Sequence, residues 1–201
     1  MKPDNGFYKV CYNFARAITA IFYRIKVSGK ENIPEGAAMV CANHSSFIDP
    51  FLIAFAFGVK YHVHIITKAE LFMIPIISSI LRKLRMISVN RGVLDVTTIK
   101  STLNYLKYGD KVVIFPEGTR VSKDDTVTAK VGAVKIAERA GVPLVPIFIP
   151  RKKPLFGKIQ VIIGEPYYLS KQPQKRAPDD YARLSDILMG KIKALPLIVG
   201  R

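Results

Sequence analysis

The sequence is poor in cysteine and histidine, and each shortage narrows what the protein can be. It has two cysteines and three histidines in 201 residues. Cys11 and Cys41 lie in apolar stretches and match no metal or redox spacing, so we expect buried thiols in a reducing compartment rather than a disulfide framework. His62 and His64 alternate on an expected strand, but no third ligand follows at a suitable spacing, and we expect no metal site.

Long uncharged apolar runs are also missing. No run reaches the roughly 18 residues that a membrane-spanning helix requires. The first apolar stretch follows Asp4, contains Lys9 and Arg16, and leads to no small-residue cleavage site, so we expect no secretory signal. Because 49% of the residues are nevertheless hydrophobic, the sequence predicts a folded globular domain.

Acidic residues are scarce relative to basic ones. Fifteen Asp and Glu stand against 31 Lys and Arg, which gives a net charge of +16. A surface of this sign attracts nucleic acid, anionic lipids, phosphorylated metabolites or an acidic carrier protein. The mean hydropathy of +0.19 is high for a nucleic-acid module of this basicity. We therefore expect anionic membrane lipids as partners, no nucleic acid, and a peripheral or monotopic protein on the cytoplasmic face of a membrane.

The N-terminal segment carries one apolar helical stripe. Residues 7–25 place large apolar side chains at i, i+3 and i+4 spacing, flanked by Lys9, Arg16 and Arg24. Two interpretations stand: a helix packed on the core, or an interfacial helix in anionic lipid. We take residues 1–27 as an amphipathic membrane-associating segment and 28–201 as the catalytic domain.

Strand and helix patterns alternate through the rest of the chain. This alternation predicts a single α/β domain with a mixed or largely parallel central sheet flanked by helices. The expected strands are 37–42, 61–66, 86–89, 111–115, 144–149 and 158–163. The expected helices are 50–57, 69–84 with a break near Pro75, 95–108, 129–140 and 179–194.

Two polar segments follow expected strands, where α/β proteins bind their ligands. In the first, Asn-His-Ser-Ser-Phe-Ile-Asp-Pro at 43–50, His44 and Asp49 would diverge by about 140° on a straight helix. They meet only if the segment turns, and Asp49-Pro50 favours a turn. Asp49 as a plain helix N-cap is the alternative. The second segment, Phe-Pro-Glu-Gly-Thr-Arg at 115–120, exposes a glutamate and an arginine suited to a phosphate.

The two segments together closely resemble motifs of the glycerolipid acyltransferases, the lysophosphatidate acyltransferase branch in particular. The first fits the His-x4-Asp motif, and the second matches the Glu-Gly-Thr-Arg turn. Two further matches agree in order and spacing: Thr67–Leu71 with Asn90–Gly92 resembles the second motif region of the family, and Val145–Pro150 resembles the fourth. Val121 departs from the serine that many relatives carry after this turn. The resemblance covers about residues 28–166.

The resemblance implies transfer of a fatty acyl group from acyl-CoA or acyl carrier protein to the sn-2 hydroxyl of 1-acylglycerol 3-phosphate, giving phosphatidate. It makes His44 the general base and Asp49 the carboxylate that orients it. Lys68, Arg91 and Arg120 become phosphate ligands, and Glu117, Gly118 and Thr119 shape their pocket. No cofactor is implied beyond the acyl thioester substrate.

General-base catalysis suits this chemistry. An imidazole with an ordinary pKa near 6.5 can take the hydroxyl proton, a carboxylate fixes its tautomer, and a thiolate leaves readily. Because no Gly-x-Ser-x-Gly elbow marks Ser45 or Ser46, we expect no acyl-enzyme. The basic clusters at 82–85 and 151–153 are interpreted as solvated faces, or as contacts to lipid phosphates or an acidic acyl carrier. Two other functions stay open: another lysophospholipid acceptor, and a non-catalytic basic membrane-binding protein.

Overall fold

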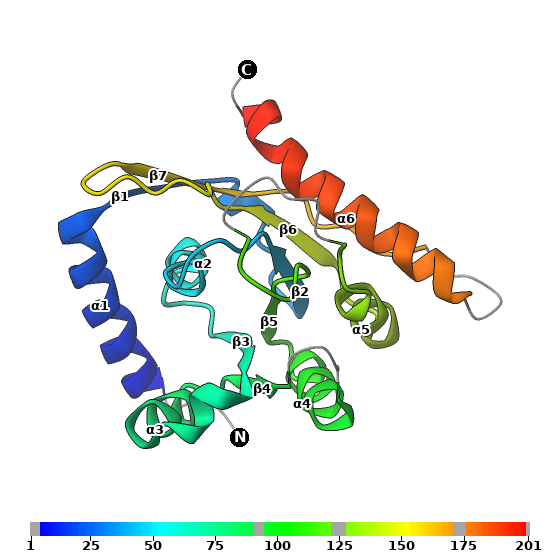
Figure 1. Ribbon diagram of the computed structural model, residues 1–201, viewed down its shortest axis with the longest axis horizontal. Coiled ribbons are helices and arrows are strands. Elements are labelled where there is room, and N and C mark those ends of the chain that lie inside the picture. Colours follow the sequence, from blue (N-terminus) through cyan, green and yellow to red (C-terminus); the bar gives the residue numbers. More distant parts are fainter. Residues whose placement is uncertain (1–4, 91–94, 122–127, 171–175, 200–201) are drawn as a thin grey trace.

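The computed structural model describes residues 5–90, 95–121, 128–170 and 176–199. This part of the chain contains six α-helices, two short 3₁₀ helices and seven strands (Figure 1). The strands are β1 (Arg24–Ser28), β2 (Ala38–Ala42), β3 (Val63–Lys68), β4 (Ile87–Val89), β5 (Lys111–Ile114), β6 (Leu144–Phe148) and β7 (Lys158–Ile163). The helices are α1 (Asn5–Phe22), η1 (Lys30–Asn32), α2 (Asp49–Phe57), η2 (Ala69–Met73), α3 (Pro75–Lys83), α4 (Val96–Lys107), α5 (Gly132–Ala140) and α6 (Pro178–Val199).

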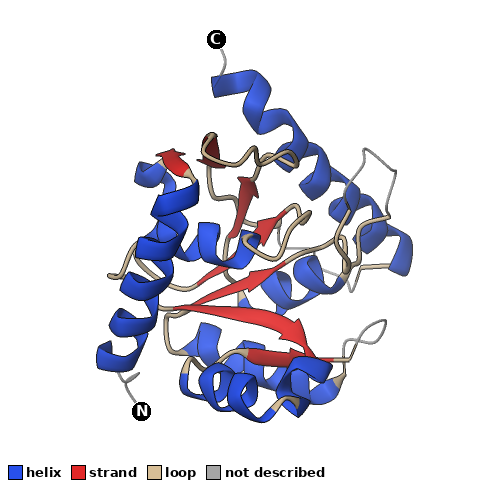
Figure 2. Cartoon of the chain, turned by 60° about the vertical axis from the view of Figure 1, so that its left-hand side comes forward, coloured by secondary structure: helices blue, strands red, loops and turns tan. Residues whose placement is uncertain are grey.

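All seven strands form one sheet in the order β1-β7-β6-β2-β5-β3-β4. Five of its neighbouring pairs are parallel, and only β6 and β7 run antiparallel. The predicted α/β domain with a largely parallel sheet is therefore confirmed. Helices cover both faces: α1 and α2 lie on one side, and α4, α5 and α6 on the other (Figures 1 and 2).

The central strand β2 shows why the sheet needs apolar residues at every position. Ala38, Val40 and Ala42 face the core beneath α2, whereas Met39 and Cys41 face the core beneath α4, α5 and α6. Every residue of β2 is buried. A parallel strand covered on both faces has no solvent side, so it reads as a continuous apolar run.

Turns at the helix ends follow the expected chemistry. Gly141 takes the left-handed conformation that ends α5, with φ of 65°, and β6 begins three residues later. The expected break near Pro75 separates η2 from α3. Among the described helices, none combines the length and apolarity needed to cross a bilayer.

Two expectations are wrong in detail. The apolar stretch 7–25 was expected to be helical throughout, but the helix ends at Phe22 and Arg24–Ser28 form β1, which pairs with β7. Alternating polar and β-branched residues in Arg-Ile-Lys-Val-Ser favour a strand over a helix. The boundary placed between residues 27 and 28 therefore falls inside β1. Of the two thiols, Cys41 is buried as expected, but Cys11 is only half-buried.

Candidate active site

The ends of three adjacent parallel strands gather the polar segments at one edge of the sheet. In the order β6-β2-β5, Ala42 pairs with Ile147 and Cys41 with Ile114, so these strands end at nearly the same level. The buried Asn43 side chain joins two of the loops that follow. Its amide group donates to the Ile149 carbonyl at 2.7 Å and accepts from the Ile149 amide at 2.8 Å.

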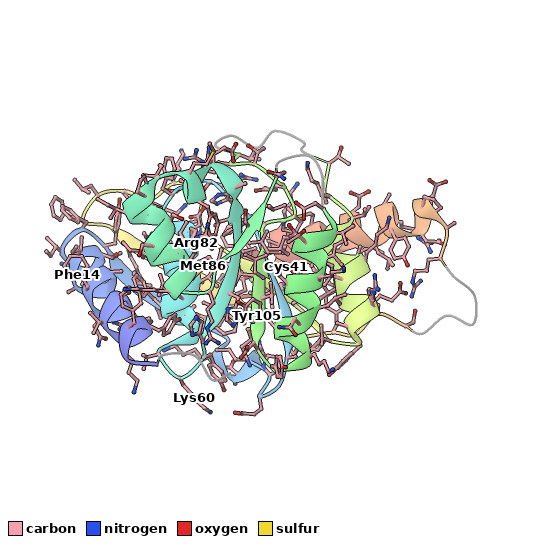
Figure 3. The ribbon with its side chains drawn as sticks, turned by 90° about the horizontal axis from the view of Figure 1, so that it is seen from below. Phe14, Cys41, Lys60, Arg82, Met86 and Tyr105 are labelled. Atoms are coloured by element: carbon pink, nitrogen blue, oxygen red, sulfur yellow. The ribbon has the colours of Figure 1, made fainter. Side chains whose placement is uncertain are left out.

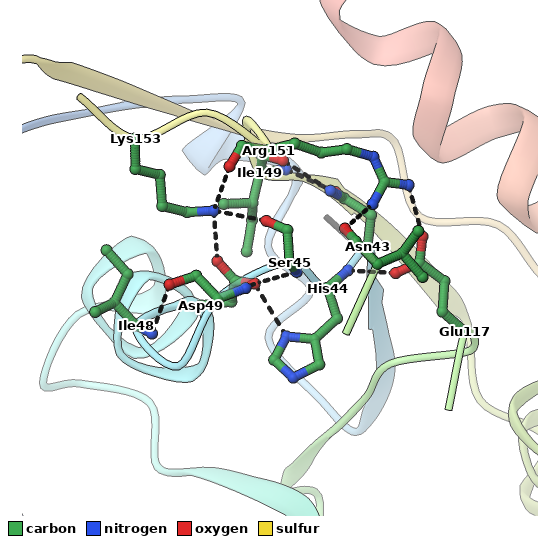
Figure 4. A network of polar contacts seen from close by, with 11 residues as sticks. Asn43, His44, Ser45, Ile48, Asp49, Glu117, Ile149, Arg151 and Lys153 are labelled. Carbon is green, nitrogen blue, oxygen red and sulfur yellow. Dashed lines mark hydrogen bonds and ion pairs between the residues drawn. The ribbon is translucent and has the colours of Figure 1, made fainter. Parts of the chain in front are cut away.

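His44 and Asp49 meet directly beyond β2 (Figure 4). The His44 Nδ1 and Asp49 Oδ2 atoms are 2.9 Å apart. The chain turns at residues 46–48, with the Asp49 amide bonded to the Ser46 carbonyl, and α2 then begins at Asp49 itself. The turn thus comes earlier than Asp49-Pro50, and the N-cap is Ile48 rather than Asp49. The aspartate is free of a capping role, and its carboxylate points back to the preceding residues.

The Asp49 carboxylate is buried and surrounded by donors. Oδ2 accepts from the amides of Ser45 at 2.6 Å and Ser46 at 2.7 Å as well as from His44. Oδ1 forms an ion pair with Lys153 Nζ at 2.9 Å. Burial alone would raise the pKa of this carboxyl, but the His44 contact, the Ser45 amide and the Lys153 ammonium together hold it below its ordinary value.

The His44 ring is fixed by this contact and by stacking. It lies on Phe115 from the end of β5, with ring centroids 4.1 Å apart. An ionised carboxylate only accepts, so Nδ1 carries the proton and Nε2 is the basic nitrogen. Nε2 points away from Asp49 and meets no hydrogen-bond partner among the described residues (Figure 4). The arrangement presents a base to whatever approaches from that side.

Glu117 holds the His44 backbone instead of pointing into an open pocket. Its carboxylate is buried, with Oε2 accepting from the His44 amide at 2.7 Å and Oε1 paired to Arg151 at 2.9 Å. The Val121 amide donates to the His44 carbonyl at 2.8 Å, and Arg151 donates to the Val121 carbonyl. These two hydrogen bonds are made by the main chain of Val121. They would form equally with the serine that many relatives carry at this position.

The expected phosphate ligands are distributed around this edge. The Arg120 guanidinium lies 3.5 Å above the Phe47 ring and is exposed, as are Gly118 and Thr119. Gly118 has φ of 68°, a left-handed backbone conformation that favours glycine at this turn. Lys68 ends β3 with its ammonium 3.9 Å from Glu70. Arg91 lies outside the described residues.

Two basic residues of the site were missed from the sequence. The cluster at 151–153 was expected to be a solvated or lipid-contacting face, but Arg151 pairs with Glu117 and the Lys153 side chain is only 5% exposed. Both follow the end of β6, just as His44 follows β2. Position after a strand was therefore the signal that could have identified them.

The two remaining histidines lie outside this site. Their rings stack on each other at 4.6 Å, with Tyr8 on the far side of His62 and Tyr105 on the far side of His64. His64 Nε2 also lies 3.2 Å from Asp110. Across the described ranges, no three His, Cys, Asp or Glu side chains are grouped to hold a metal ion.

Comparison with known proteins identifies the family of this chain. The acyltransferase family model matches residues 24–150, which span β1 to the end of β6 and include His44, Asp49 and the turn at 117–120. The chain belongs to the acyltransferase family. The predicted family is thereby confirmed.

Two relatives and one solved structure within this family carry the name of the same kind of enzyme. A 1-acyl-sn-glycerol-3-phosphate acyltransferase of Bacillus subtilis is 36% identical over 195 residues, which cover 94% of this chain and 96% of that protein. One from Pseudomonas aeruginosa is 30% identical, covering 74% and 60%. The crystal structure of the 1-acyl-sn-glycerophosphate acyltransferase PlsC from Thermotoga maritima matches with a TM-score of 0.70 and 26% identity, covering 96% of this chain and 80% of that one.

Proposed function

We propose that this acyltransferase moves a fatty acyl group from an acyl thioester to the sn-2 hydroxyl of 1-acylglycerol 3-phosphate, giving phosphatidate. The observation that carries the proposal is the His44–Asp49 contact of 2.9 Å, which leaves Nε2 as an accessible base. The relatives named for this reaction support the choice of acceptor.

In the proposed mechanism His44 is the general base. Nε2 takes the proton of the acceptor hydroxyl while its oxygen attacks the thioester carbonyl, and Asp49 stabilises the imidazolium that forms. The tetrahedral intermediate then expels the thiolate, and the carbon–sulfur bond breaks. The proton passes from the imidazolium to the departing sulfur, so the base is regenerated. This route consumes no cofactor and requires no metal, because a thiolate leaves without further activation.

The acceptor phosphate is assigned to the cations beyond β3 and β5. Arg120 is exposed, and its guanidinium is preset over Phe47, within the same segment that carries His44 and Asp49. Lys68 at the end of β3, and Arg91 by resemblance, complete the proposed ligands, with Gly118 and Thr119 forming the turn around them. Glu117 supports this pocket by holding the His44 backbone rather than by touching substrate.

The proposed location is a membrane surface, with the protein peripheral or monotopic on the cytoplasmic face and anionic lipids as partners. The outer face of α1 exposes a stripe of large apolar side chains, Val10, Phe14, Ile18 and Ile21. Phe14 points outward at the edge of the molecule (Figure 3). The net charge of +16 favours anionic headgroups and an acidic acyl carrier or acyl-CoA as donor. No role in nucleic-acid binding is proposed.

Acyl transfer to two acceptors tests the assignment. Purified protein with an acyl-CoA or acyl carrier protein donor should convert lysophosphatidate to phosphatidate and acylate lysophosphatidylcholine much more slowly. Arg120→Ala should raise KM for lysophosphatidate by about tenfold, the cost of one charge-assisted contact. Lys158→Ala, on β7, is the matched loss of one exposed cation and should not raise this KM. Equal rates on both acceptors would assign a different substrate.

A further inference from the structure

Lys153 is a cation buried against the carboxylate that supports the base. Its side chain is 5% exposed, although lysine side chains normally extend into solvent. The ammonium lies 2.9 Å from Asp49 Oδ1, on the opposite side of the carboxylate from the His44 ring (Figure 4). Asp49 is thus held between a fixed positive charge and the imidazole.

The surroundings of Lys153 fit an ion at a set position. Besides Asp49, its ammonium donates to Ser45 Oγ at 2.8 Å and lies 3.5 Å from the Arg151 carbonyl. Removing an ammonium from water costs several kcal/mol, and only a well-placed partner offsets that cost. Here the partner is the Asp49 carboxylate, which is itself fully buried. A solvated surface lysine would need none of these contacts.

The loop that carries Lys153 is held in place by the catalytic segment itself. Ile149 is bonded twice to the Asn43 side chain, and Arg151 binds Glu117 and the Val121 carbonyl. The stretch that matches the family model ends at residue 150, so Lys153 lies just beyond it. The contacts of Ile149 and Arg151 set the position of Lys153 beside the catalytic segment.

We propose that Lys153 is a positioning residue of the His44–Asp49 pair, which fixes the rotamer of the Asp49 carboxylate and balances its charge from the side opposite the imidazole. This role rests on the proposed acyl transfer, because His44 acts as a general base only in that reaction. With Lys153 in place, protonating His44 adds a second positive charge beside one carboxylate. Without it, the carboxylate would hold an imidazolium more strongly, and the base would be blocked at higher pH.

Among the described residues, three charged side chains contact the pair or its supports. Lys153 contacts Asp49, Glu117 contacts the His44 amide, and Arg151 contacts Glu117. Glu117 and Arg151 form an ion pair of their own at 2.9 Å, so their charges largely offset each other at His44. Removing the Lys153 charge therefore leaves the negative charge of the Asp49 carboxylate without a neighbouring ammonium.

The test is the pH profile of kcat/KM for acyl transfer to lysophosphatidate. Lys153→Gln retains a donor for Ser45 and Asp49 but loses the charge. We expect its acid limb to move to higher pH by about one unit, and its plateau to fall about fivefold as the carboxylate loses its anchor. Lys153→Arg retains the charge and should keep the acid limb of the wild type. Lys152→Gln removes the same charge from the exposed neighbour and should not move the limb.

A second measurement separates this proposal from the proposed function. The chain has three histidines, so the His44 ring can be followed by NMR without substrate. Its titration midpoint should rise by about one unit in Lys153→Gln. A midpoint and an acid limb that stay in place would overturn the role of Lys153, even with acyl transfer intact. An equal shift in Lys152→Gln or Lys153→Arg would also overturn it. A wild type without acyltransferase activity would refute the function, while the NMR midpoint would still decide on Lys153.

Discussion

Asp49 is buried and His62 is half-buried, and the surroundings of these two ionisable residues shift their pKa values for opposite reasons. Asp49 has three hydrogen-bond donors on one oxygen and an ammonium on the other, and these lower the pKa of its carboxyl despite burial. In the described part of the chain the His62 ring contacts the Leu84 carbonyl and no carboxylate, and burial lowers the pKa of its imidazole to about 4. The first stays charged and serves the base, whereas the second stays neutral and serves packing.

The neutral His62 makes stability depend on pH. Its pKa falls from 6.5 in the unfolded chain to about 4 in the fold. As the pH drops, His62 therefore binds a proton in the unfolded chain before it does so in the folded protein. The free energy of unfolding falls between pH 7 and pH 4 for this reason. Because the ring is partly solvated, we expect His62 to account for about 1 kcal/mol of the stability lost between pH 7.5 and pH 5. His62→Phe should lose that much less over this range, as measured by urea unfolding at both values.

Tyr8→Phe is the control for this stability measurement. It keeps an aromatic ring stacked on His62 and leaves the imidazole in place. Its loss of stability on acidification should match the wild type. An equal pH dependence in His62→Phe would show that other groups set the acid stability.

The sequence predicts the role of a site residue where its partner lies close to it along the chain. His44 and Asp49 are five positions apart, and a turn between them was foreseen because nothing else brings them together. Lys153 was not foreseen, because its partner Ser45 lies 108 positions away and the two meet only if β6 lies beside β2. The run of basic residues at 151–153 does not by itself indicate that one of its side chains is buried.

Among the elements, α1 has two apolar faces rather than one. Tyr12 and Ala15 pack on the core beneath α2, whereas the stripe that includes Val10 and Phe14 is exposed. The sequence left a core helix and an interfacial helix as alternatives, since both produce apolar residues at helical spacing. The structure assigns one face to packing, and the outer face supports the proposed contact with lipid.

The exposed stripe of α1 should dominate binding to anionic vesicles. The double variant Val10→Ser/Phe14→Ser removes two side chains that are 67% and 68% exposed and that packing does not require. We expect about tenfold weaker flotation with phosphatidylglycerol vesicles, because burying such side chains in lipid contributes about 1.5–3 kcal/mol each when complete. Tyr168→Ser, at 69% exposure elsewhere on the molecule, should bind as the wild type does. Equal flotation of the double variant would place the lipid contact on another surface.

The expected strands and helices after residue 28 occur in the structure, because their apolar patterns are long and bounded by turn residues. The strand β1 was missed, since its five residues continue directly from an apolar helix. Its identity depends on pairing with β7, more than a hundred residues away. Local pattern could not supply that partner.

At the scale of the whole molecule, strand order creates the site. The α/β class followed from the alternation of patterns, but the order β6-β2-β5 did not. That order places the His44 segment between the Glu117 turn and the Lys153 loop, and both contact it directly. Because the three strands end at one level, a base, its carboxylate and their supports converge without a long loop.

The central claim is that His44 is the base for acyl transfer, and turnover of His44→Ala with lysophosphatidate tests it most directly. We expect kcat to fall by about 10²–10⁴-fold with little change in KM, since the base acts in the transition state. His62→Phe, which removes a histidine from the ring stack outside the site, should retain the wild-type rate at neutral pH. If His44→Ala retained more than about a tenth of the wild-type kcat while folded, the base would have to be another group.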